Sequence, residues 1–142
     1  MNNQDVSVEA GAGQFVWFPN ARHTLAEHPG QRYQLRTESQ LIDAIRNPMQ
    51  VPKEDADCYM VSSYNGHDAR SHEAQRLHGH MGALWFDADQ GNMSPQALHA
   101  KLMQALGPCR IHTWATASST PQAMRSRACV MLDKPIPGAW YS

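Results

Sequence analysis

The chain has 142 residues, of which 42% are hydrophobic and 18% are charged, and this suits one soluble domain with a real core. No hydrophobic run approaches the ~20 residues of a membrane-spanning helix, which argues against a membrane partner. The formal net charge of −1 gives no overall argument for nucleic-acid binding. The basic residues after Pro108 nevertheless outnumber the acidic ones, so a local basic surface is possible there.

The ends of the chain and its cysteines indicate the compartment. Residues 1–13 are small and polar, and we expect them to form a flexible arm before a single domain spanning residues 14–142. The polar, acidic start is unlike a secretion signal. Cys58, Cys109 and Cys129 are odd in number and lack metal-type pairing, so we expect reduced thiols in the cytoplasm.

Four segments of the first half show secondary-structure signals. Gln14–Phe18 is a short aromatic run that predicts an edge strand. Thr37 to Gln40 fits a capping box, so a helix is expected to begin there and to stop at Asn47. Cys58–Tyr64 predicts a second strand. The polar segment His67–Leu77 is compatible with either a short helix or a loop.

The second half predicts strand, helix, strand, turn and strand. Met81–Asp89 is an apolar run that ends in two acids, and the helix after it starts at Ser94 as N-cap. Strands are then expected at Arg110–Ala117 and Arg125–Leu132, the latter broken by 133–137. The helical crossover predicts that the strands before and after it are parallel neighbours. We therefore expect an α+β fold, a mixed β-sheet with helices packed on one face.

The two acids at the end of the central strand are the first candidate site. Side chains alternate along a strand, so Asp87 and Asp89 are expected on the same face. Two neighbouring carboxylates repel unless a cation lies between them, and their oxygens suit Mg²⁺ or Mn²⁺. The alternative is a solvated turn before the next helix.

Basic and hydroxyl residues follow further along. Arg125 and Arg127 lie two apart on a predicted strand and so share a face. If the carboxylates lie on that face too, metal ions and guanidinium groups together would suit a polyphosphate. The hydroxyls of Ser118, Ser119 and Thr120 are candidates for phosphate contacts or for a polar turn. A further alternative is a metal-dependent nuclease that adds His78 and His80 to the two acids.

The order of these motifs resembles a known family. A strand ending Phe-Asp-Ala-Asp at Asp89 is followed by a helix, then by Trp114–Pro121 and Arg125–Pro137. Together they look like the catalytic core of the archaeo-eukaryotic primase superfamily, in the form carried by plasmids and phages. The resemblance covers roughly Met81 to Pro137 and implies a palm resembling an RNA-recognition fold.

The resemblance also implies roles for individual residues. Asp87 and Asp89 would be the catalytic, metal-binding acids, with Asp133 as an imperfect candidate for a third. Nucleotide contacts would come from the residues Ser118, Ser119, Thr120, Arg125 and Arg127. The family usually has a histidine where this chain has Ser119, so that contact would either be missing or be supplied by His112.

The function expected from the resemblance is two-metal nucleotidyl transfer on a DNA template by a mobile-element replication protein. Nucleoside triphosphates, single-stranded DNA and a helicase or another replication protein would be its partners. The ending at Ser142 predicts a primase-like domain that is incomplete at its C-terminus. The substituted histidine leaves open an alternative, a non-catalytic nucleic-acid-binding accessory domain on a degenerate primase fold.

Overall fold

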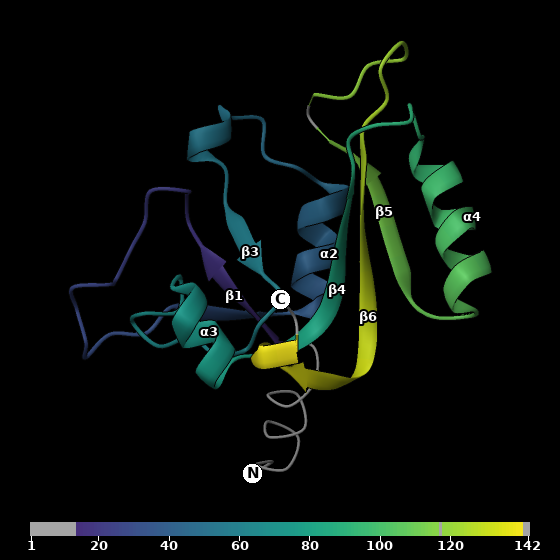
Figure 1. The fold of residues 1–142 in the computed structure, drawn as a ribbon. Helices are drawn as coiled ribbons and strands as arrows, with labels where there is room; N and C mark the ends of the chain where they lie inside the picture. The colour runs from purple at the N-terminus through teal and green to yellow at the C-terminus, as the bar shows by residue number, and fades with distance from the viewer. Residues whose placement is uncertain (1–13, 117, 141–142) are drawn as a thin grey trace. The chain divides into compact units, whose positions relative to one another are not determined.

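The computed structural model describes residues 14–116 and 118–140, which form two compact units (Figure 1). The first unit combines the residues up to Gly82 with those from Asp133 on, and the second is the contiguous segment Ala83–Leu132. The expected arm at residues 1–13 lies outside the described residues. Among the described residues, no helix has the length and hydrophobicity to span a bilayer. The fold is α+β, as the sequence predicts.

The first unit contains a three-stranded antiparallel sheet. Strand β1 (Gln14–Phe18) lies between β2 (Gln34–Thr37) and β3 (Cys58–Met60). The prediction of an edge strand at Gln14–Phe18 is therefore wrong, because two partners flank it. Phe15 and Val16 point to opposite faces and are both fully buried, as expected for a central strand.

Helix α2 (Glu38–Arg46) begins at the predicted capping box. The Gln40 backbone N–H donates to the Thr37 hydroxyl at 3.3 Å, and the Thr37 N–H donates to the Gln40 side-chain oxygen at 2.8 Å. Two of the helix's otherwise unpaired N–H groups are thereby satisfied. The helix packs against β1 and β2, and its Leu41 is buried.

The remaining elements of the first unit are short. They are the 3₁₀ turns η1 (Lys53–Asp55) and η2 (Gly138–Trp140) and helix α3 (His72–His78), which settles the open choice at His67–Leu77. Helix α3 packs so closely against η2 that a Cβ on Gly138 would lie 1.8 Å from the Gln75 carbonyl oxygen. Only glycine fits at that position.

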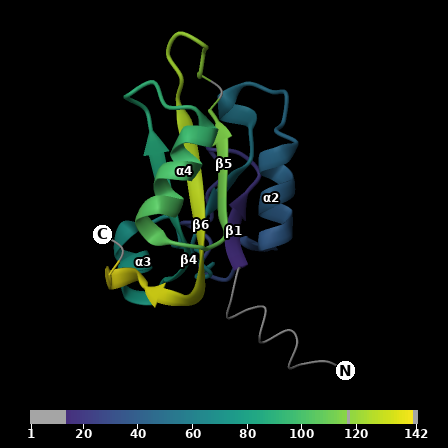
Figure 2. The ribbon, with the colours of Figure 1, turned by 90° about the vertical axis from the view of Figure 1, so that its right-hand side faces the viewer.

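The second unit is organised around a sheet in the order β4-β6-β5 (Figures 1 and 2). Its elements are α4 (Pro95–Leu106), β5 (Ile111–Ala115) and the parts of β4 (His80–Ala88) and β6 (Ser126–Pro137) that fall within Ala83–Leu132. The prediction that the strands flanking α4 are neighbours in a mixed sheet is wrong. Strand β6 lies between them, and the sheet is antiparallel.

Strand β6 is also longer than predicted, since it continues from Leu132 through Pro137. The pairing with β5 ends at Val130, apart from one bond from the Met131 N–H to the Arg110 carbonyl. Residues 133–137 therefore have one neighbouring strand fewer, and a proline without an N–H is tolerated where a strand has an unpaired edge.

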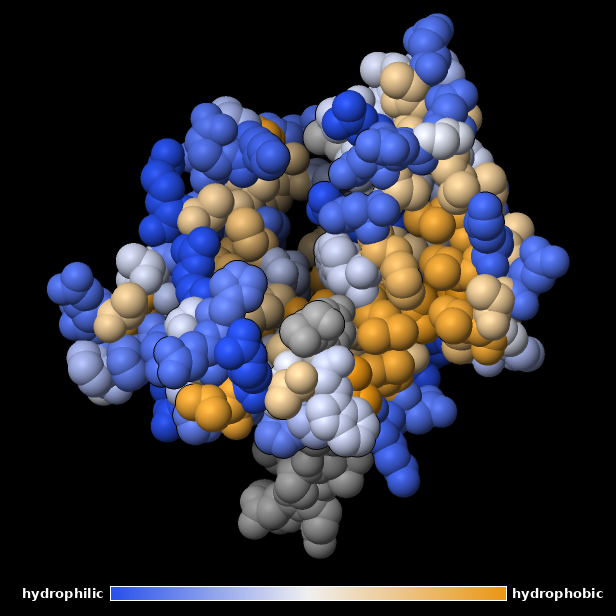
Figure 3. All heavy atoms as spheres, viewed as in Figure 1, coloured by the Kyte–Doolittle hydropathy of each residue, from blue (hydrophilic) through white to orange (hydrophobic). Residues whose placement is uncertain are grey.

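Helix α4 matches the sequence closely. The Ser94 hydroxyl accepts from the Ala97 N–H at 3.1 Å, and Pro95 occupies the first turn. At the other end Gly107 adopts φ 80°, a left-handed conformation that favours glycine. Hydrophobic residues gather in Figure 3 over the region that α4 and β6 occupy in Figure 1.

Candidate functional site

The carboxyl end of β4 carries an ion pair. Arg127 Nε on β6 donates to Asp87 Oδ1 on β4 at 2.5 Å. The two side chains are 39% and 47% exposed, respectively. The sequence places both residues in the candidate site, and the structure brings them into direct contact. The negative charge on Asp87 already has a positive partner within the chain.

Two tryptophans adjoin this ion pair. The Trp85 and Trp114 rings meet edge to face with centroids 5.3 Å apart, and the Arg127 guanidinium carbon lies 5.9 Å from the Trp85 centroid. Trp114 is directly opposite Arg127 in the β5–β6 register, so both side chains leave the same face. A guanidinium, a carboxylate and two indoles therefore share one face of this sheet.

The position of Ser126, the first residue of β6, shows on which face of the sheet the ion pair lies. Its buried hydroxyl donates to the Met93 carbonyl at 2.7 Å, just before the N-cap of α4. Because side chains alternate along β6, Arg127 leaves the opposite face. The ion pair and the indoles thus lie on the side of the sheet away from the start of α4.

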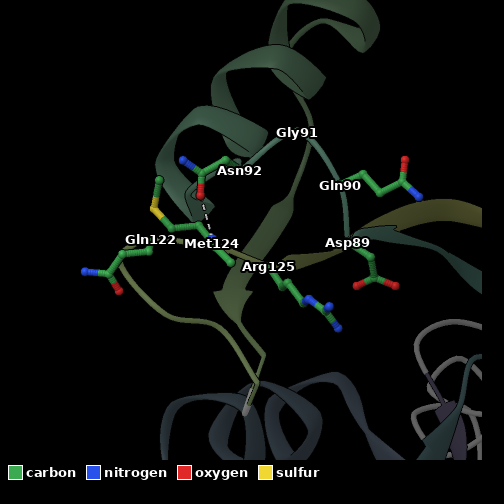
Figure 4. Close-up of a pocket in the computed structure, with 8 residues that line it drawn as sticks. Asp89, Gln90, Gly91, Asn92, Gln122, Met124 and Arg125 are labelled. Atoms are coloured by element: carbon green, nitrogen blue, oxygen red, sulfur yellow. Dashed lines mark hydrogen bonds between the residues drawn. The ribbon is translucent and has the colours of Figure 1, made fainter.

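Asp89 and Arg125 belong to a neighbouring pocket rather than to the strand face. Strand β4 ends at Ala88 and β6 begins at Ser126, so both residues lie in loops. They line an open pocket of about 230 Å³ formed by residues 89–92 and 122–125 (Figure 4). In Figure 4 their side chains lie on the same side, and those of Gln122 and Met124 point away. The four predicted charged residues thus lie in one unit as two sets. Asp87 contacts Arg127 on the strands, and Asp89 lines the same pocket as Arg125.

The two loops of the pocket are held together by Asn92. Its side-chain oxygen accepts from the Met124 N–H at 2.6 Å across the pocket (Figure 4). Gly91 and Asn92 adopt φ 86° and 51°, left-handed conformations that glycine and asparagine tolerate best. The sharp turn after Asp89 therefore depends on the Gln-Gly-Asn sequence.

The predicted nucleotide-binding hydroxyls have local backbone or side-chain contacts. Ser119 Oγ accepts from the Arg125 N–H at 2.9 Å, and Thr120 Oγ1 accepts from the Ala123 N–H at 3.0 Å. Ser118 Oγ lies 3.4 Å from the Thr116 hydroxyl. These contacts shape the turn before β6 and fix the backbone of Arg125. Their role toward a nucleotide stays a prediction.

The other predicted residues lie elsewhere. His112 pairs with Cys129 on the Trp114 face, two residues further from the ion pair. Asp133, His78 and His80 belong to the first unit, whereas Asp87 and Asp89 belong to the second. Within residues 14–116 and 118–140 there is no group of three or more His, Cys, Asp or Glu that could hold a metal. The nuclease alternative stays a prediction without added support.

The donor chemistry of Asp87 and Asp89 fits a hard divalent cation. Both side chains are exposed carboxylates at the end of β4, and such oxygens are the ligands that Mg²⁺ and Mn²⁺ prefer. Arg127 engages one oxygen of Asp87. A cation bound by Asp87 would therefore compete with this guanidinium.

Trp85, Trp114 and Asn92 were not among the predicted site residues. Trp85 had a usable signal, because it lies two residues before Asp87 and so shares its strand face. The contribution of Trp114 depends on the position of β6 between β4 and β5, which no local pattern specifies.

Comparisons of the chain with protein-family models, with curated proteins and with solved structures found no match.

Proposed function

We propose that the second unit binds nucleoside triphosphates together with Mg²⁺ or Mn²⁺ and transfers nucleotides on a DNA template, as a primase-polymerase domain does. The observation that carries the proposal is the gathering of Asp87, Asp89, Arg125 and Arg127 at one end of one sheet. A polyphosphate needs both charge types, since guanidinium groups bind its oxygens and carboxylates hold its metal ions.

The arrangement of β4, α4, β5 and β6 supports the same proposal by analogy of fold. Two strands joined by a helical crossover, with a third strand between them, form a split β-α-β unit. This unit is a building block of the palm that the motif order predicts. The analogy concerns fold alone, and the function depends on the side chains.

Each charged residue has a role in the proposal. Asp87 and Asp89 would hold one or two divalent ions, which when bound supply charge neutralisation of the triphosphate and activation of a 3′-hydroxyl. Arg125 would bind phosphate oxygens from the pocket, where its backbone is fixed by Ser119. Arg127 would turn from Asp87 toward the phosphates. Single-stranded DNA and a helicase or other replication protein are the proposed partners.

The test is calorimetric binding of a nucleoside triphosphate with Mn²⁺. The variant Asp87→Asn/Asp89→Asn should bind at least tenfold more weakly, because the carboxylate ligands are gone. Asp55→Asn is the matched control, since Asp55 is also a surface carboxylate paired with an arginine, Arg22, at 3.1 Å. It should bind like wild type. Equal binding by the double variant would refute the proposal.

One observation favours a second candidate, a non-catalytic nucleic-acid-binding domain. The 2.5 Å contact with Arg127 already neutralises Asp87, which a domain without metal chemistry would retain for structure. This candidate predicts DNA binding that weakens steeply with salt and is indifferent to Asp87→Asn/Asp89→Asn. The same double variant therefore separates the two functions.

A further inference from the structure

We infer that Trp85 and Trp114 form a stacking site for a nucleobase of single-stranded DNA or of a nucleotide. The inference deepens the proposed function, on which it rests, by giving the base a place beside the charged residues. It is carried by the ring geometry and by the chemistry of the adjoining ion pair.

The ring geometry leaves aromatic surface for a ligand. In an edge-to-face pair, the edge of one ring covers one face of the other, so the Trp85–Trp114 contact uses only part of the aromatic surface of the two rings. Arg127 lies over Trp85 at 5.9 Å from the centroid. Both tryptophans are partly exposed. Aromatic rings of this kind stack bases with little sequence preference.

The ion pair beside the rings fits the edge of a base. Arg127 offers N–H donors and Asp87 offers carboxylate acceptors, on the same face as Trp114. A nucleobase has two flat faces and an edge that carries both donors and acceptors. While Arg127 and Asp87 stay paired their charges nearly cancel, so the pair suits a neutral base; Arg127 turns to phosphate only where a metal ion takes its place at Asp87.

The test compares two labelled 12-mers at one salt concentration, an oligothymidylate and the same backbone without bases. Fluorescence anisotropy with the full chain should show tighter binding of the strand with bases. Trp114→Leu and Trp85→Leu should weaken that binding roughly 5- to 100-fold and leave binding of the abasic strand unchanged. Trp140→Leu is the control, because Trp140 is 75% exposed in the first unit.

A second measurement needs no variant and so avoids any loss of folding. Irradiation of a 5-iodouracil strand bound to the wild-type chain should crosslink it to Trp85 or Trp114. Crosslinks confined to other residues, or equal affinity of wild type for the two strands, would overturn the inference. Retained base preference in both leucine variants would overturn it as well.

Competitors identify the source of the base. If a nucleoside triphosphate displaces the strand and inorganic triphosphate does not, the site binds the base of an incoming nucleotide. If neither displaces it, the site belongs to the strand. The inference and the proposed function can fail separately. If the chain shows no preference for bases but binds triphosphate with Mn²⁺, only the stacking site is refuted. If it prefers bases but binds no triphosphate with Mn²⁺, only the nucleotidyl-transfer centre is refuted.

Discussion

The two units contain the same aromatic arrangement in different surroundings. In the first unit Phe18 and Tyr33 meet edge to face at 5.0 Å, with the Arg70 guanidinium 5.0 Å from the Phe18 centroid. In the second unit Trp85 and Trp114 meet at 5.3 Å, with Arg127 over Trp85. Each is an edge-to-face pair with an arginine over one ring.

The two arrangements differ in the hydrogen-bond partners of their polar side chains. Tyr33 accepts a hydrogen bond from the Leu25 N–H at 2.7 Å, and Arg70 donates to the His23 carbonyl. Both partners are backbone atoms of one loop, and the Phe18 and Tyr33 rings are almost fully buried. Arg127 instead ends on Asp87, a half-exposed side chain.

The difference separates structural chemistry from chemistry that is open to a ligand. The backbone carbonyl that Arg70 contacts carries no net charge, whereas the carboxylate of Asp87 can exchange one cation for another. Buried rings contribute hydrophobic free energy, and partly exposed rings retain surface for a partner. The first arrangement fastens a loop to β1, and the second lies where we propose that ligands bind.

The largest expected effect concerns the buried pair. Phe18→Ala should lower the free energy of unfolding by about 3–5 kcal/mol, because it removes a fully buried ring. Trp114→Leu should cost clearly less, since its ring is partly exposed. Urea unfolding followed by circular dichroism gives both values. Equal losses of unfolding free energy would show that the two aromatic pairs contribute equally to stability, and would contradict the proposed difference between them.

The next effect concerns the exchange of cations at Asp87. Arg127→Gln should strengthen binding of Mn²⁺ alone roughly two- to fivefold, the range expected from releasing an exposed ion pair. The same change should weaken triphosphate binding, because a phosphate donor is lost. Mn²⁺ electron paramagnetic resonance and calorimetry measure the two affinities.

Arg22→Gln is the control for that variant, because Arg22 also pairs with an exposed aspartate. It should change neither affinity. If Arg127→Gln leaves Mn²⁺ binding unchanged, the ion pair does not control access of cations to Asp87. Its role would then be to stabilise the fold, like that of the Arg70 contact.

The smallest effect concerns a side-chain pair of the first unit. The Tyr64 hydroxyl donates to Asp68 Oδ1 at 2.6 Å, and this bond lowers the pKa of Asp68 below its ordinary value. A lowered carboxyl pKa stabilises the fold above the unfolded pKa of about 3.9 and loses that contribution as the pH falls through the folded pKa.

Tyr64→Phe should therefore raise the pKa of Asp68 toward its ordinary value, as followed by carboxyl ¹³C shifts. The variant should be slightly less stable than wild type near pH 7 and equal to it in strong acid. A pKa of Asp68 that stays low in the variant would assign the shift to a backbone hydrogen bond and the nearby histidines instead.

The sequence predicts those elements whose signals are local. The capping box at Thr37, the N-cap at Ser94 and the apolar run before Asp87 each specify an element within a few residues. The two strand patterns placed Asp87 and Arg127 in one sheet and made their proximity a condition of the predicted site. Whether the acids and the arginines share a face stayed open, because alternation relates residues of one strand only, and the structure has Asp87 and Arg127 in contact.

The rest depends on contacts between distant segments. The strand order β4-β6-β5 is set by which apolar faces pack together, so the expected parallel neighbours were wrong. Strand β2 has only four residues and little apolar pattern, and β1 supplies its hydrogen bonds. Asp89 lies outside the strand because β4 ends at Ala88 and the chain turns at Gly91. A glycine in the sequence indicates a turn but does not specify the residue at which the strand ends.

The division of the chain at Gly82 and Asp133 has a consequence for synthesis on the ribosome. The second unit is one uninterrupted segment, so all its residues have emerged once Leu132 is free of the exit tunnel. The first unit lacks its closing contact until Gly138 emerges and donates its N–H to the Gly79 carbonyl at 2.9 Å. Nascent chains fold as segments become available. The proposed ligand-binding unit can thus be finished before the unit that starts the chain.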